Sequence, residues 1–97
     1  TGGCLLENIP RVLPDHLSAK LNSNSWSQPE IFKWLQKEGN IDSHEMYRVL
    51  NCGVGMVVII SKESSSQAIE HLSACGENAW LIGEVVHSKG EQVIIEK

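Results

Sequence analysis

The longest apolar run of the chain, residues 54–60, constrains its fold most strongly. Five of these seven residues are Val or Ile, and only Gly55 interrupts the run. Side chains that branch at Cβ favour strands, and a continuous apolar run is typical of a strand buried on both faces. The run is far too short to cross a bilayer as a helix. We therefore expect a buried strand at residues 54–60.

Patterns on either side of this run predict alternating helices and strands. Alternating apolar and polar residues predict a half-buried strand at 17–21, and two further strands are expected at 79–86 and 92–95, joined by a hairpin turn at 88–91. Helices are expected at 5–13 (bent near Pro10), 29–39, 42–50 and 61–74. The order α-β-α-α-β-α-β-β predicts an α+β fold with a mixed β-sheet backed by helices.

The helical periodicity also predicts which side chains face the core. Each expected helix from residue 29 onward places three apolar residues on one face, and the three tryptophans have aliphatic neighbours that suggest a core position. The residues expected to point inward are Ile31, Trp34, Leu35, Met46, Val49, Leu50, Ala68, Ile69 and Leu72, together with Trp26 and Trp80.

Composition narrows the class of protein. The 97 residues, 41% of them hydrophobic, suit one domain, and a net charge of −4 argues against a general binder of nucleic acids or of acidic membranes. Three scattered cysteines without a C-x-x-C pair indicate a reducing compartment. The four histidines are scattered as well, so their spacing does not suggest a zinc site.

Two glycine motifs are the candidate binding elements, and each has two interpretations. Gly2 and Gly3 precede an apolar, helix-compatible run, where free backbone N–H groups attract anions, but the pair also suits a tight turn. Asn51 and Gly53 either end a helix or line a groove shared with the first loop. If the motifs meet, Cys4 and Cys52 approach each other, and a mild oxidant then joins them if geometry allows.

Two polar side chains near the first motif also have two interpretations. Arg11 is placed either to neutralise a phosphate or to pair with Glu7, four residues earlier. Asn8 is placed either to hydrogen-bond a substrate or to cap the turn before Pro10. No complete catalytic set of side chains is recognisable in the chain.

Three ordered stretches carry a family resemblance. They are Thr1-Gly2-Gly3 continuing through Glu7-Asn8-Ile9-Pro10-Arg11-Val12-Leu13-Pro14, then residues 29–40, and then residues 45–56 with Asn51-Cys52-Gly53-Val54-Gly55-Met56. The sequence resembles aminoimidazole ribonucleotide (AIR) synthetase, also named phosphoribosylformylglycinamidine cyclo-ligase, an ATP-dependent enzyme of purine synthesis. Cys4 departs from the family, which usually has a third glycine at that position.

The resemblance implies a function for the parent protein. Residues 1–97 are expected to be the second half of the C-terminal domain of a longer cytoplasmic enzyme, with α/β/α layers that are partially ferredoxin-like. That enzyme, expected to be a homodimer, would convert formylglycinamidine ribonucleotide to aminoimidazole ribonucleotide with ATP and Mg²⁺. ATP and Mg²⁺ would bind mainly to an N-terminal part, so these 97 residues alone are expected to be inactive. No nucleic acid or membrane partner is implied.

The resemblance also implies which residues lie on the substrate-phosphate side, and it assigns no catalytic or metal-binding residue to these 97. The implied binding residues are Thr1, Gly2, Gly3, Asn8, Arg11, Asn51 and Gly53. Two alternatives remain open: a non-catalytic module that binds a phosphoribosyl ligand, and another ATP-dependent enzyme of the same superfamily. The Glu7-Asn8-Ile9-Pro10-Arg11 wording favours the cyclo-ligase over selenophosphate synthetase, thiamine-monophosphate kinase and formylglycinamidine ribonucleotide synthetase.

Overall fold

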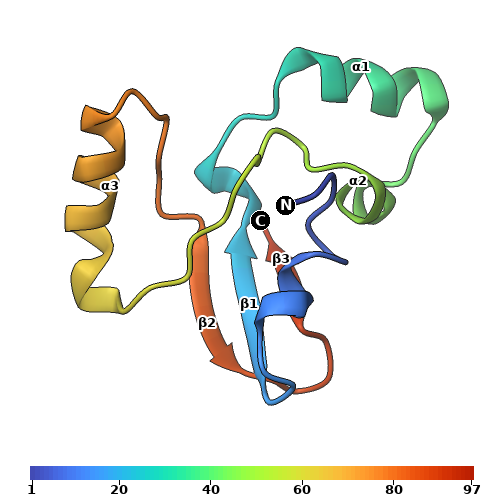
Figure 1. Ribbon diagram of the computed structural model, residues 1–97. Coiled ribbons are helices and arrows are strands. Elements are labelled where there is room, and N and C mark those ends of the chain that lie inside the picture. The colour runs from blue at the N-terminus through green and yellow to red at the C-terminus, as the bar shows by residue number, and fades with distance from the viewer.

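A three-stranded sheet organises the computed structural model, which describes residues 1–97 (Figure 1). Strand β1 (Leu17–Asn22) lies in the middle, between β2 (Gly83–His87) and β3 (Val93–Glu96). β1 pairs antiparallel with β2 and parallel with β3. The expected α+β fold with a mixed sheet is confirmed.

The expected hairpin between the last two strands is wrong. β2 and β3 follow each other in sequence, but β1 lies between them, with Ala19 opposite both Val85 and Val93. The turn at 88–91 therefore crosses the end of β1, where Ser88 N–H donates to His16 O at 2.8 Å and Ser18 Oγ donates to Glu91 O. Ser18 is fully buried rather than facing solvent as the alternation predicted.

Three helices follow the local signals that the sequence provides. Helix α1 (Glu30–Gly39) starts directly after Pro29 and is followed by Asn40, which adopts the left-handed conformation (φ 50°). Helix α2 starts after Asp42, whose side chain accepts a hydrogen bond from His44 N–H at 3.0 Å. A 3₁₀ turn precedes the third helix, so that helix starts later than predicted. The bounds are α1 (Glu30–Gly39), α2 (Ser43–Val49) and α3 (Ser65–Ala74), with 3₁₀ turns at Ile9–Val12, Ser23–Ser25 and Lys62–Ser64. None of the helices is long and apolar enough to span a membrane.

The helix expected at 5–13 is reduced to the 3₁₀ turn Ile9–Val12. Pro10 has no N–H to donate, and its ring disfavours a preceding helical turn. The amides of Leu5 and Leu6 instead both donate to Tyr47 O at 3.2 Å, which ties this segment to α2. The segment therefore lies against the rest of the fold as an irregular series of turns.

The core is formed by one face of the sheet and the N-terminal segment. Its seven buried residues come from that segment, from β1 and β3, and from the chain after α2: Leu5, Ile9, Leu13, Ala19, Leu21, Val54 and Val93. Trp26 and Trp80 pack against this cluster with their ring centroids 6.3 Å apart. Two of the three tryptophans thus belong to the core or its margin, as expected.

The predicted apolar faces of the helices are buried only in part. Met46 is 1% exposed and confirms the prediction for α2, whereas Val49 is 43% exposed. Ile31 and Trp34 on α1 are each 56% exposed, so the prediction that they face the core is wrong. Nothing in the structure covers that face of α1, which buries no residue.

The run 54–60 is not a strand, which corrects the prediction of a buried one. It has no regular secondary structure, and residues 56–60 form no backbone hydrogen bond. Met56 is 81% exposed, and Val58, Ile59 and Ile60 are also exposed. β2 and β3 occupy both edges of β1, and the run pairs with the outer edge of neither.

Candidate functional site

The Gly2–Gly3 loop presents three consecutive backbone donors. Gly2 has φ 64° and Gly3 has φ 111°, conformations that favour glycine and support the turn interpretation. The N–H groups of Gly2, Gly3 and Cys4 donate no hydrogen bond within the chain, and the next two amides are those bonded to Tyr47 O. Successive free N–H groups on a turn form a concavity that suits an anion.

The side chain of Asn8 holds this loop through hydrogen bonds to Cys4. Its Nδ2 donates to Cys4 O and to Cys4 Sγ, both at 3.2 Å. A Cβ added to Gly2 would lie 3.3 Å from the Asn8 carboxamide, so the two residues are in close packing. Asn8 precedes the 3₁₀ turn at Ile9 without capping it through its side chain, which corrects the capping interpretation. Its amide nitrogen holds the loop, while its Oδ1 remains available.

The second motif is a turn held from both sides. Asn51 Oδ1 accepts from Gly53 N–H at 2.9 Å, and Cys52 has φ 53°. Trp26 Nε1 donates to Cys52 O at 3.0 Å, and a Cβ on Gly53 would lie 2.5 Å from Pro29 Cδ. These contacts support the turn interpretation of Asn51 and Gly53.

Thr1 connects the two motifs. Its backbone nitrogen donates to Gly55 O at 2.8 Å, and its Oγ1 donates to Val54 O at 2.9 Å. These bonds place the start of the first motif beside Val54 and Gly55 of the second, and the groove between the motifs stays a prediction. Cys4 and Cys52 are both buried free thiols, and burial raises the pKa of the Cys52 thiol to about 11.

Arg11 is exposed and forms no ion pair, so the predicted Glu7–Arg11 pair is wrong. The helical turn begins only at Ile9, and the two side chains therefore do not share a helix face. Glu7 instead lies 3.4 Å from Arg48, which also bonds Glu45. The hydrogen bond from Arg48 lowers the pKa of the Glu45 carboxyl, and its partner carboxylates raise the pKa of Arg48. Arg11 keeps a free positive charge.

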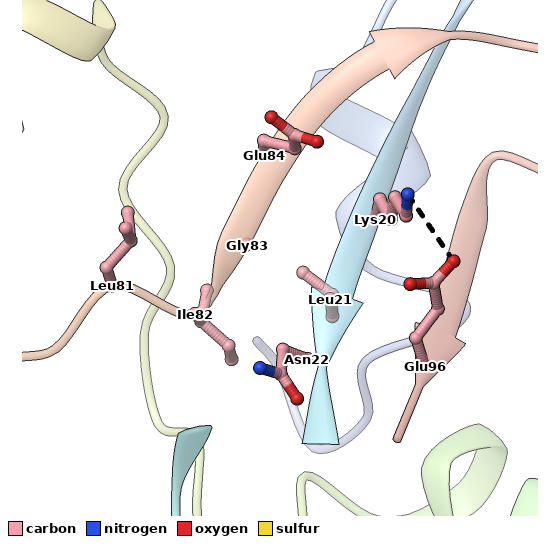
Figure 2. Close-up of a pocket in the computed structure, with 8 residues that line it drawn as sticks. All are labelled: Lys20, Leu21, Asn22, Leu81, Ile82, Gly83, Glu84 and Glu96. Atoms are coloured by element: carbon pink, nitrogen blue, oxygen red, sulfur yellow. Dashed lines mark ion pairs between the residues drawn. The ribbon is translucent and has the colours of Figure 1, made fainter. Parts of the chain in front are cut away.

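An open pocket of about 350 Å³ lies away from the glycine motifs (Figure 2). Lys20 of β1 points toward Glu96 of β3, with Nζ 3.5 Å from Oε1, while Glu84 projects from β2 outside this pair. The lining is completed by Leu21, Asn22, Leu81, Ile82 and Gly83. None of the predicted site residues lines it. Each strand contributes one charged residue to this region, and these single charges gave no sequence signal for a pocket.

A second cavity of about 290 Å³ lies beside the N-terminal segment. It is lined by Leu6, Pro10, His44, Glu91, Gln92 and Val93. This cavity adjoins the stretch that carries the family resemblance but contains none of the predicted binding residues. No group of three or more His, Cys, Asp or Glu residues is placed to hold a metal ion.

A comparison with protein families gives one finding. The sequence model of the family described as "AIR synthase related protein, C-terminal domain" matches residues 1–96. The match covers the N-terminal loop, the second glycine motif and all three strands.

Proposed function

We propose that this chain forms the substrate-phosphate side of a cyclo-ligase. The proposal starts from the fact that the chain belongs to the family of AIR synthase related C-terminal domains. Members of this family are typically ATP-utilising enzymes. The parent reaction would convert formylglycinamidine ribonucleotide to aminoimidazole ribonucleotide. The motif Glu7-Asn8-Ile9-Pro10-Arg11 supports the cyclo-ligase over the related enzymes of the superfamily.

The observation that carries the proposal is the set of three free amides at Gly2, Gly3 and Cys4. A phosphate monoester carries several acceptor oxygens, and backbone N–H groups bind them without ordering any long side chain. Asn8 and Thr1 hold the loop from two sides, so the donors are in place before a ligand arrives. Arg11 adds an unpaired positive charge on the same N-terminal segment.

The chain's own residues bind and orient the substrate and supply no catalytic group. Transfer of a phosphoryl group depends on positioning and on neutralising charge more than on a protein nucleophile. ATP would supply the phosphoryl group that turns the amide oxygen into a leaving group. The family resemblance supports the assignment of Mg²⁺ and of most contacts with ATP to another part of the parent enzyme.

The first experiment titrates the isotopically labelled chain with ribose 5-phosphate and follows amide chemical shifts by NMR. The amides of Gly2, Gly3 and Cys4 are expected to shift most. Gly3→Ala should weaken this binding at least about tenfold, equivalent to about 1.4 kcal/mol. Gly76→Ala is the matched control, since Gly76 also has a positive φ (91°) and open space around it. Equal effects of the two variants, or unshifted loop amides, would contradict the phosphate role.

The second experiment tests the reaction in the full-length parent. Gly3→Ala should raise the KM for formylglycinamidine ribonucleotide more than it lowers kcat, because the loop binds a part of the substrate that does not react. A parent that makes no aminoimidazole ribonucleotide would refute the reaction. Phosphate binding by the loop of such an inactive parent would favour a binding module or another enzyme of the superfamily.

Arg11→Ala separates the contribution of charge from that of the loop. Arg11 forms no ion pair, so its removal should change stability by less than about 0.5 kcal/mol. If the guanidinium neutralises the substrate phosphate, the KM of the full-length enzyme should rise clearly. An unchanged KM would remove Arg11 from the proposed binding set and leave the backbone amides in place.

The setting of the enzyme also belongs to the proposal. Three free cysteines, two of them buried, support a reducing compartment such as the cytoplasm. The family resemblance supports a homodimeric parent. Light scattering after gel filtration of the full-length protein would test the dimer, and a monomer at micromolar concentration would contradict it.

A further inference from the structure

The end of helix α3 places two metal-ligating side chains next to each other on the surface. His71 and Cys75 lie four residues apart, about one turn of a helix, and both are exposed. Cys75 is a free thiol, and its Sγ lies 3.9 Å from His71 Nε2. The spacing of the histidines by itself does not suggest a zinc site, but it takes no account of this cysteine.

The distance between the two donor atoms suits a shared zinc ion. Zinc lies about 2.3 Å from a cysteine sulfur and about 2.0–2.1 Å from a histidine nitrogen, in tetrahedral geometry. At a tetrahedral angle of about 109°, these bond lengths separate the sulfur from the nitrogen by about 3.6 Å. The observed 3.9 Å is close to this value, and a small rotation of either exposed side chain removes the difference. The pair is therefore arranged as a chelate before an ion arrives.

The electrostatic surroundings of the pair favour a cation. The C-terminal end of a helix carries partial negative charge, and Cys75 caps α3 at that end. Glu70 and Glu77 lie within two residues of the pair in the sequence, and neither forms an ion pair. The net charge of the whole chain is −4. A divalent cation at this end of α3 is therefore stabilised by its surroundings.

One chain supplies only half of a structural zinc site. Such a site takes four protein ligands, and no third His, Cys, Asp or Glu is placed to join the pair. Helix α3 buries no residue, and Figure 1 shows it standing at the margin of the molecule, apart from the sheet. A second copy of the chain can therefore bring its own pair to the same ion. Two copies related by a two-fold axis provide four ligands.

We propose that His71 and Cys75 form one half of a zinc site, which a second copy of this chain completes with its own histidine and cysteine. Two sulfur and two nitrogen donors in tetrahedral geometry select zinc, whereas Mg²⁺ and Ca²⁺ take oxygen ligands. The ligands bind as thiolate and neutral imidazole, so each thiol proton goes to solvent when the ion binds. This inference does not depend on the proposed function, because neither residue belongs to the phosphate-binding set.

Light scattering after gel filtration tests the assembly, on the intact chain in a phosphine reductant that keeps every thiol free. One zinc ion for every two chains should double the apparent mass at micromolar concentration. Excess EDTA should restore the monomer, which would not happen if a disulfide linked the two chains. Cobalt(II) in place of zinc should give the strong visible absorption of a tetrahedral ion bound to thiolates.

Two single variants assign the ligands. Cys75→Ser and His71→Ala should each raise the zinc concentration for half-maximal dimerisation at least about tenfold, since even the loss of a group that only orients a ligand costs about 10–100-fold in metal affinity. His87→Ala is the matched control, because His87 is also exposed but lies on β2, and it should keep the original value. A chain that stays monomeric with zinc, a dimer that both variants still form, or cobalt absorption that survives Cys75→Ser would overturn the proposal.

Discussion

Gly83→Ala should be the most destabilising single methyl addition at a glycine in this fold. A Cβ at Gly83 would lie 2.0 Å from Lys20 O and 2.9 Å from Leu21 Cα, both backbone atoms of the neighbouring strand. An ordinary contact needs at least 3.4 Å, so β2 must move away from β1 by about 1.4 Å (3.4 − 2.0). Lys20 and Leu21 cannot yield as a flexible side chain would.

The magnitude follows from the bonds that such a movement breaks. Asn22 N–H to Ile82 O, now 2.8 Å, would lengthen beyond hydrogen-bond range, as would its neighbours in the ladder. Two lost bonds at about 1 kcal/mol each, with about 1–3 kcal/mol for overpacking, give about 3–5 kcal/mol. A domain of this size has about 5–15 kcal/mol in total, so the variant would be close to unfolding.

Urea denaturation followed by tryptophan fluorescence would measure the effect, since Trp26 and Trp80 both pack against the core. Gly55→Ala is the matched control: it adds the same methyl group where no atom lies within 4 Å and φ is not positive. The control should change the free energy of unfolding by less than about 1 kcal/mol. A Gly83→Ala chain as stable as the Gly55→Ala chain would refute the argument from close strand approach.

Three further results are expected. Thiol reagents at pH 8 should modify exposed Cys75 first and Cys52 only on unfolding. Because burial raises the pKa of Cys52 from 9.0 to about 11, the free energy of unfolding measured by urea titration should fall as pH rises from about 9 to 11. The lowered pKa of Glu45 beside Arg48 acts in the opposite sense, so its contribution is present above the unfolded value of 4.5 and lost as pH falls below it; Arg48→Ala should remove this acid dependence, and an unchanged profile would contradict it. Trp26→Phe should lower the free energy of unfolding by about 1 kcal/mol, because it removes the hydrogen bond to Cys52 O. An unaltered midpoint of thermal or urea unfolding would show that this bond does not stabilise the fold.

Features with a local cause could be predicted from the sequence. Pro29 and Asp42 mark the starts of two helices, and Gly76, with φ 91°, follows the third, because caps depend on a few adjacent residues. The alternation over 17–21 identified β1 for the same reason. These predictions required no knowledge of distant partners.

Features set by distant partners could not be predicted in this way. The position of β1 between β2 and β3 depends on pairing across more than 60 residues, and a hairpin between the last two strands satisfied every local signal equally well. The stripe of Ile31 and Trp34 was a correct helix pattern, but no other element covers it. Periodicity indicates which face is apolar and says nothing about what packs there.

The candidate site also contains features with a local cause and features set by other parts of the chain. The positive φ values of Gly2 and Gly3 agree with what a glycine pair suggests. The bond from Asn8 to Cys4 was not foreseen, because the sequence suggested only a substrate contact or a turn cap for Asn8. The contact of Thr1 with Val54 and Gly55 was anticipated only through the resemblance, which placed both motifs at one site.

The central place of β1 has a consequence for how the protein is made. Residues 17–22 leave the ribosome about 60 residues before β2, an interval of about 3–12 s at ordinary elongation rates. During that time both edges of β1 are bare, and neither can be closed by anything nearby in the nascent chain. The sheet therefore assembles only when residues 83–96, which hold β2 and β3, are available. A message cut short before the codon for Gly83 would yield a product that lacks this sheet, which is a natural substrate for chaperones and proteases.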